Sequence, residues 1–182
     1  MTTPGGLKRM SDDIIEGVND LIKKVVKETH PVKKKVKQEM GYDGPDVFEE
    51  VIEEGIVYPR LAMEDIEEIT IGFNTAMHHI LLGLNPEYVG LAPFPPVIHQ
   101  SMDIKARDLG VEINDSSYLF VLPNEAGFVG GDNVGVLICE QPYKSDDIQL
   151  ILDIGTNGEL ILGNRHKLVS SSCATGPAME GA

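Results

Sequence analysis

The sequence predicts an α/β fold in which a mixed sheet is flanked by helices. Segments with apolar residues at helical spacing alternate with short apolar runs, and each of these runs is bounded by residues typical of turns. One such run, 150–154, is followed by a polar, glycine-bearing turn and a second apolar run up to Gly163, the pattern of a β-hairpin. The 182 residues, of which 42% are hydrophobic, are enough for one full domain with a core.

The N-terminal third is predicted to be helical. A helix is expected from Ser11, a suitable N-cap, to about Thr29, with its apolar residues on one face. The basic run 33–37 is either a contact patch for an acidic partner or, the favoured interpretation, a solvated helix face. The acidic segment 45–54 is expected to form a second amphipathic helix.

Strands and helices alternate in the middle of the chain. Strands are predicted at 68–72 and 117–122, with a short helix at 101–110 between them. A further helix is expected from Asn74, a reasonable N-cap, to about Leu84. It carries His78 and His79, which point about 100° apart on a helix and so cannot both face one metal ion. One buried, hydrogen-bonded histidine and one surface histidine are therefore expected, with metal ligation as the alternative.

A small-residue loop at 123–133 leads into a helix that continues through Cys139. Glycine-rich turns before a helix either bind phosphate through its N-terminal N–H groups or allow tight packing of helix on strand. If the strands on either side of this helix are parallel neighbours, a right-handed crossover places the loop near the turn that follows Asp153.

Composition excludes several classes of protein. A net charge of −14 argues against nucleic-acid binding, which normally requires a basic surface. Two isolated cysteines rule out a disulfide scaffold, a zinc ribbon or a cysteine-ligated iron–sulfur cluster within this chain. No stretch approaches the roughly 18 apolar residues of a membrane helix, and residues 1–6 do not resemble a signal peptide. The expected protein is soluble and cytoplasmic, with no membrane partner.

The turn after Asp153 is the main candidate site. The strand before it is apolar at consecutive positions, as expected for a strand covered on both faces. A carboxylate ending such a strand needs a metal ion or a bound water to compensate its burial. Gly155 and Gly158 allow unusual backbone geometry and close approach of an anion, while Thr156 and Asn157 add donors. The alternative is an ordinary type I′ hairpin centred on Asn157-Gly158.

The strand–helix–strand–hairpin order with an Asp-Ile-Gly-Thr turn resembles the actin/Hsp70/sugar-kinase ATPase superfamily. The resemblance implies an incomplete ribonuclease-H-like fold in which this hairpin is the second of two phosphate loops. A small-molecule kinase of the same superfold is an alternative, and Glu125 and Asp132 are its candidate catalytic bases.

A narrower resemblance rests on five motifs in a fixed order. They are the segments at 74–79, 90–94, 126–130, 153–159 and 176–182. Together they resemble the ATP-dependent reductive activators of corrinoid proteins, including those of methylamine methyltransferase systems. In that family ATP hydrolysis drives an electron from an iron–sulfur domain to an inactive Co(II) corrinoid, which restores the Co(I) state for methyl transfer.

The resemblance assigns roles to residues of this chain. Asp153 would orient the Mg²⁺-bound or attacking water and so act as both catalytic and metal-site residue. Gly155, Thr156, Asn157 and Gly158 would cradle phosphate. Gly176 and Pro177 would open a helix near the ATP. The expected cofactors are ATP and Mg²⁺, and the expected partner is a corrinoid protein of a methyltransferase system.

The resemblance also predicts the organisation of the chain. Residues 1–67 are expected to be a helical part of a first subdomain, 68–145 its remainder, and 146–182 the truncated start of a second subdomain. On this basis the chain is expected to be a fragment that is inactive alone, and a homodimer is compatible with the family. A non-catalytic module that docks a corrinoid or methyltransferase protein is the alternative from a different class.

Overall fold

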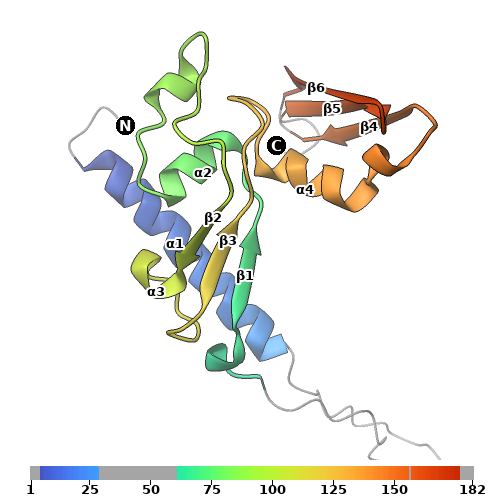
Figure 1. Ribbon diagram of the computed structural model, residues 1–182. Helices are drawn as coiled ribbons and strands as arrows, with labels where there is room; N and C mark the ends of the chain where they lie inside the picture. The colour runs from blue at the N-terminus through green and yellow to red at the C-terminus, as the bar shows by residue number, and fades with distance from the viewer. Residues whose placement is uncertain (1–4, 29–60, 156, 177–182) are drawn as a thin grey trace, which may run out of the picture.

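The computed structural model describes residues 5–28, 61–155 and 157–176. The basic run 33–37 and the predicted helix at 45–54 lie outside the described residues. The strands form two separate three-stranded sheets, the second beyond the end of the first toward which β1 points (Figure 1), in place of the single mixed sheet expected. No described helix is both long enough and apolar enough to cross a membrane.

The first sheet has the strand order β1-β3-β2, built from β1 (Glu68–Ile71), β2 (Met102–Lys105) and β3 (Tyr118–Val121). β1 pairs with β3 in parallel, and β2 pairs with β3 antiparallel. The two predicted strands are confirmed to within one residue at each end. The predicted helix at 101–110 is wrong in its first half, because Met102 to Lys105 pair with β3, and only α3 (Ala106–Leu109) is helical.

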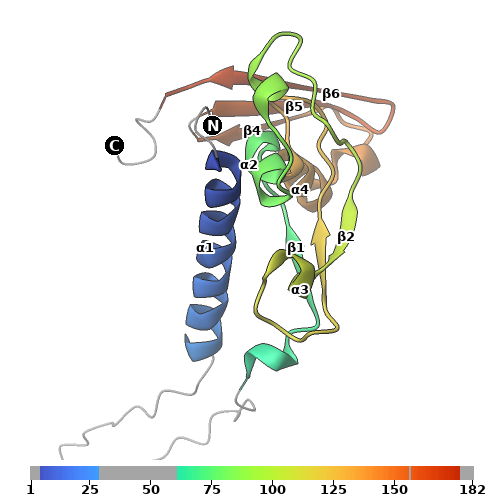
Figure 2. The same cartoon turned by 90° about the vertical axis from the view of Figure 1, so that its left-hand side faces the viewer.

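Helix α1 (Gly6–Glu28) covers one face of this sheet along its whole length (Figure 2). Its side chains Ile14, Ile15, Val18 and Ile22 pack against a core that includes Leu119 and Val121 of β3. The helix begins at Gly6, five residues before the predicted N-cap. Ser11 therefore lies inside it, and its hydroxyl donates to the Leu81 carbonyl of the next helix at 3.3 Å.

Helix α2 (Thr75–Leu81) follows β1 and begins as predicted. The Asn74 side chain accepts a hydrogen bond from the Met77 N–H at 2.9 Å, so Asn74 is the N-cap. Residues 82–101, which include the 3-10 turn η2 (Glu87–Gly90), project beyond the sheet before the chain returns through β2 (Figure 1).

The second sheet is an antiparallel meander of β4 (Gln149–Ile154), β5 (Asn157–Asn164) and β6 (Lys167–Ala174). Helix α4 (Gly131–Glu140) and the turn η3 (Pro142–Lys144) join the two sheets. The helix through Cys139 and the hairpin are confirmed, whereas β6 was not predicted. Coverage of β4 on both faces is wrong, because Leu150, Leu152 and Ile154 on one face are each more than half exposed.

Candidate functional site

The turn between β4 and β5 is set by the register of the two strands. Ile154 pairs with Gly158 and Asp153 with Glu159, so three residues, 155–157, separate the paired positions. The Gly155 N–H donates to the Asn157 carbonyl at 2.8 Å. A type I′ turn centred on Asn157-Gly158 is therefore wrong, because both residues already belong to β5 and pair with β6.

Glycine is needed for different reasons at Gly158, in the strand after the turn, and at Gly176, beyond the end of β6. Gly158 is buried and its φ is negative or extended, so unusual backbone geometry does not explain it. A Cβ at Gly158 would instead lie 2.9 Å from the Thr175 methyl group and 3.4 Å from the Cys173 sulfur. Contact with Cys173 of β6 and with Thr175 just after it thus leaves little room for a side chain there, whereas Gly176, with a φ of 83°, has the backbone that favours glycine.

The remaining predicted phosphate contacts are only partly described. Asn157 is exposed and Gly155 is half-buried at the same turn. The Thr175 hydroxyl donates to the Gly155 carbonyl, which ties the turn to the end of β6. Thr156 and Pro177 lie outside the described residues. The structure therefore brings the turn and Gly176 to one end of the second sheet.

Asp153 lies half-buried on the face of the second sheet that also carries Ile161, which is 3% exposed. Glu159 is directly opposite it on β5 and accepts a hydrogen bond from the Ser172 hydroxyl at 3.0 Å. Burial raises the pKa of the Glu159 carboxyl above its usual range, and the nearby charges of Asp132 and Asp153 raise it further. Three carboxylates, from α4, β4 and β5, thus influence one region.

This region fits a hydrated divalent cation better than one enclosed by protein ligands. Within the described part of the chain, no three His, Cys, Asp or Glu side chains are placed to hold a metal ion together. Mg²⁺ usually keeps several waters and binds to one or two carboxylates plus the phosphates of a nucleotide. Asp153 and Glu159 would supply those carboxylates, and a cation there would offset the charges of Asp132 and Asp153, which add to the effect of burial in raising the pKa of Glu159.

The loop before α4 serves packing, the second of the two alternatives for this glycine-rich segment. A Cβ at Gly130 would lie 2.7 Å from the backbone of Phe73, Asn74 and Thr75, which leaves no room for a side chain. The first amides of α4 are also engaged within the protein. The Asp132 N–H donates to the Phe73 carbonyl at 3.3 Å, and the Asn133 N–H donates to the Asp132 carboxylate at 2.8 Å.

The same loop reaches the second sheet, but not by the expected route. β3 and β4 lie in different sheets, so they are not parallel neighbours and that expectation is wrong. Contact is made instead through Glu125, whose carboxylate accepts a hydrogen bond from the Ser170 hydroxyl of β6. Ser170 pairs with Ile161, so its side chain shares the face of Asp153 and Glu159.

Both histidines of α2 are buried, with 0% exposure, so the prediction of one surface histidine is wrong. His79 is fully hydrogen-bonded: Nδ1 lies 2.7 Å from the Thr75 carbonyl, and Nε2 accepts from the Val97 N–H at 2.8 Å. Neither ring nitrogen of His78 has a hydrogen-bond partner. Burial, together with neighbouring His79, lowers the pKa of His78 to about 4.

Sequence reasoning missed Glu159 and Ser172 as members of this site. A signal was available for Glu159, since residues placed symmetrically about a hairpin turn face each other across the two strands. None was available for Ser172, because the strand that carries it was not predicted.

Residues 147–182, which contain the antiparallel hairpin with its Asp-Ile-Gly turn, match a family model for the C-terminal ASKHA domain of RACo. This match places the C-terminal part of the chain in the actin-like ATPase class. A second family model, which describes the RACo middle region, matches residues 45–145. The chain belongs to the RACo family.

Two relatives agree with this assignment. The corrinoid activation enzyme RamQ of Eubacterium limosum is 34% identical over 137 residues, which cover 75% of this chain and 23% of RamQ. A solved structure described as a reductive activator for corrinoid, iron-sulfur protein matches with a TM-score of 0.79 and 28% identity. The match covers 99% of this chain and 24% of that chain. The chain therefore spans about a quarter of the length of each relative.

Proposed function

We propose that this chain is part of an ATP-dependent reductive activator that returns the Co(II) form of a corrinoid protein to Co(I) for methyl transfer. The observation that carries the proposal is the agreement of both relatives in function, one by sequence and one over 99% of this chain by structure. Their shared function favours the activator over a small-molecule kinase of the same superfold.

In this proposal the β4–β5 turn binds nucleotide phosphate. The turn residues Gly155, Thr156, Asn157 and Gly158 would cradle the phosphate, and Asp153 would orient a water for attack. Glu159, held by Ser172, shares the Mg²⁺ site with Asp153. When bound, Mg-ATP supplies the phosphoryl group whose hydrolysis drives electron transfer. The protein contributes positioning and charge stabilisation, which are the main requirements of this chemistry.

The domain match suggests a revised place for this turn. The matched ASKHA segment begins at residue 147, two residues before β4, so the turn lies in the first hairpin of that segment. We therefore propose that it is the first phosphate loop of the ASKHA domain, in place of the second loop expected from the sequence. Residues up to 145 then form the separate middle region instead of a first ATPase subdomain.

The electron must come from outside these residues. Cys139 lies in α4 and Cys173 in β6, and they are the two cysteines of the sequence. A cluster normally needs four cysteine ligands, so the iron–sulfur domain of the proposed activator is a separate part. A corrinoid protein as partner, a homodimer and a cytoplasmic location remain parts of the proposal.

The first test measures the melting temperature of the chain with and without Mg-ATP. A ligand at 100 times its dissociation constant stabilises a fold by about 2.7 kcal/mol, which corresponds to roughly 5–10 °C for a chain of this size. Asp153→Ala should remove the shift. Asp103→Ala, which removes an exposed carboxylate from the first sheet, should retain it.

The outcomes separate the candidate functions. A shift that Asp153→Ala removes supports nucleotide binding at the turn. An equal shift in that variant would contradict the role of Asp153. No shift in the wild-type chain would overturn nucleotide binding at the turn by these residues alone and would leave the family assignment standing.

A further inference from the structure

An apolar groove runs between α1 and β1. Four side chains of α1 line it on one side, among them Leu21 and Val25, and residues 66 and 69–73 line it on the other. None of the described residues that line it is charged, yet Leu21 and Val25 are 61% and 59% exposed. Apolar side chains that line one groove and remain exposed mark a place where another apolar surface packs. The groove is called the α1–β1 groove below.

One wall of the α1–β1 groove is an edge strand. β1 stands first in the strand order β1-β3-β2, so in the described part of the chain one of its two long sides has no neighbouring strand. Proteins commonly cover such an edge with a helix or loop. Cover of β1 by another segment of the protein is therefore expected.

Residues 29–60, which lie outside the described residues, connect two points beside this groove. The described chain stops at Glu28, at the end of α1, and resumes at Leu61, just before the turn η1 (Met63–Asp65). η1 lies close to α1, and both ends of the connection are at the same end of the first sheet (Figure 1, Figure 2). Residues 29–60 are therefore tethered at both ends next to the groove.

Within this connection, residues 45–54 have the pattern that the groove requires. Their apolar residues recur at helical spacing and so share one side of a helix, with five carboxylates among the remaining positions. The apolar residues are Val47, Phe48, Val51 and Ile52. Six residues, 55–60, separate this segment from Leu61, and they span at most roughly 25 Å. The segment is thus held within reach of a groove whose α1 side, from Val18 to Val25, is roughly 10 Å long.

Tethering and the family boundaries favour this segment over an outside partner. A tethered segment is present at a roughly millimolar effective concentration, which a separate protein of equal intrinsic affinity would have to reach to compete. The model of the RACo middle region matches residues 45–145, so residues 45–54 belong to the same family region as β1. A segment of that region is the cover expected for its own edge strand, in preference to a part of the relatives that this chain does not span.

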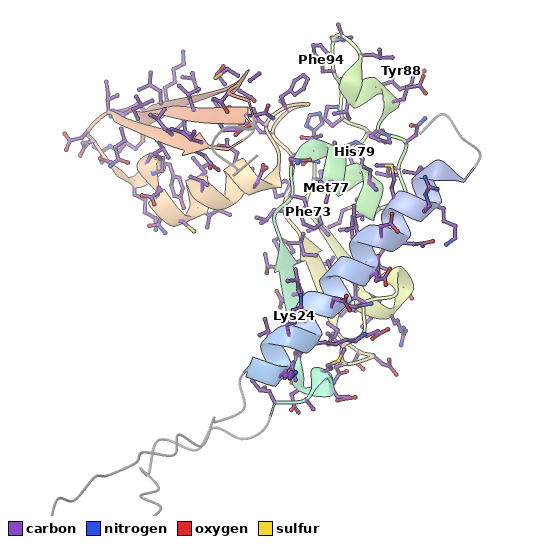
Figure 3. All side chains as sticks on the ribbon, turned by 180° about the vertical axis from the view of Figure 1, so that it is seen from behind. Lys24, Phe73, Met77, His79, Tyr88 and Phe94 are labelled. Atoms are coloured by element: carbon purple, nitrogen blue, oxygen red, sulfur yellow. The ribbon has the colours of Figure 1, made fainter. Side chains whose placement is uncertain are left out.

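Charge favours the same segment and gives it a direction. Lys24 is exposed and follows Leu21 by three residues, so the two side chains are neighbours on the helix surface (Figure 3). Glu68 is exposed at the other rim, where β1 begins. The carboxylates of residues 45–54 are therefore attracted to the α1 rim and repelled by the β1 rim. Such exposed charges add little stability, but they orient a segment that apolar contacts hold in place.

We propose that residues 45–54 dock in the α1–β1 groove, with Phe48 and its apolar neighbours against the groove and the carboxylates toward Lys24 and solvent. Docking holds α1 to the middle region, although α1 precedes the residues that the family model matches. This inference does not rest on the proposed function.

The first test is cross-linking within the full chain. Cys139→Ser and Cys173→Ser remove the two exposed native thiols. In that background, Leu21→Cys is combined either with Phe48→Cys or with Glu50→Cys, which lies two residues further and so about 200° round a helix. With oxidised glutathione as the oxidant, the Phe48 pair should form its disulfide at least about tenfold faster than the Glu50 pair. The tether is nearly the same length in both pairs, so a difference in rate reports docking.

A second test leaves the native cysteines in place and probes the groove itself. Val25→Ser removes an apolar side chain from the groove, and Val97→Ser, at a valine of nearly equal exposure outside it, is the matched control. Val25→Ser should lower the melting temperature by at least about 3 °C more than Val97→Ser. This excess should disappear in a Phe48→Ser background, because the effects of residues in contact are not additive.

Each result decides for or against docking. Faster cross-linking of the Phe48 pair within one chain, together with the excess effect of Val25→Ser, supports it. Equal rates for the two cysteine pairs would overturn it, as would equal melting temperatures of Val25→Ser and Val97→Ser. Disulfides that form between two chains, faster with Phe48→Cys than with Glu50→Cys, would overturn it in favour of a second copy. An excess for Val25→Ser that persists in the Phe48→Ser background would overturn it in favour of a cover from elsewhere in the protein.

Discussion

Acidification should destabilise this protein through a single buried histidine. His78 is fully buried, has no hydrogen-bond partner at either ring nitrogen, and its pKa is lowered from 6.5 to about 4. The unfolded chain therefore takes up a proton below pH 6.5, whereas the folded protein does not until about pH 4. Stability that is complete above pH 6.5 is lost as the pH falls through this window.

The size of the effect follows from the two pKa values. One pKa unit corresponds to 1.36 kcal/mol, so the free energy of unfolding should fall by about 3 kcal/mol between pH 7 and pH 4 on account of His78. His78→Leu keeps a side chain of similar volume and removes the ionisable ring. Between pH 7 and pH 4 the free energy of unfolding of the variant should therefore fall by about 3 kcal/mol less than that of wild type.

Chemical denaturation at a series of pH values, with wild type and variant side by side, measures this difference. Carboxylates also titrate near pH 4, but they are common to both proteins and cancel in the comparison. His166→Leu, which removes an exposed imidazole from the β5–β6 turn, is the control. The reasoning would be refuted if the free energy of unfolding of wild type and of His78→Leu fell by the same amount, to within about 0.5 kcal/mol, between pH 7 and pH 4. That margin is about the effect of an ordinary surface change.

Two further predictions concern the site and the packing around it. Asp153→Asn removes one of the charges that raise the pKa of Glu159, so the pKa of Glu159 should fall. NMR titration of the Glu159 carboxyl measures this pKa. An unchanged pKa would mean that the two carboxyl groups do not interact. Gly130→Ala should destabilise the fold by about 1–3 kcal/mol or more, because its Cβ meets backbone at 2.7 Å. Gly90→Ala places a Cβ in open space, so its free energy of unfolding should stay within about 0.5 kcal/mol of wild type; equal effects of the two alanines would contradict the packing argument.

Local sequence determined the elements whose signals lie within a few residues. The apolar stripe of α1 and the Asn74 cap of α2 specify those helices without help from distant parts of the chain. The hairpin is likewise local, because a polar turn between two apolar runs brings its own strands together. Asp153 and the turn that follows it can therefore be identified from the amino-acid pattern alone.

Tertiary structure decided what depends on a partner far along the chain. Strand β6 carries three consecutive serines and has no apolar alternation, and it forms because β5 offers a paired edge along its length. Residues 102–105 form a strand for the same reason, since β3 lies beside them. Ser172, which holds Glu159, is part of the candidate site only through that pairing.

Burial of both histidines and the meeting of three carboxylates were also outside the reach of sequence. His78 and His79 are enclosed because different elements cover both sides of α2 at once, which helical spacing alone does not reveal. Asp132 influences Glu159 because α4 lies alongside the second sheet (Figure 1), although the two residues are 27 positions apart. The sequence by itself determined the turn that carries Asp153. The packing of α4 and β6 around that turn decided which charges surround it, because electrostatic interaction depends on distance in space and not along the chain.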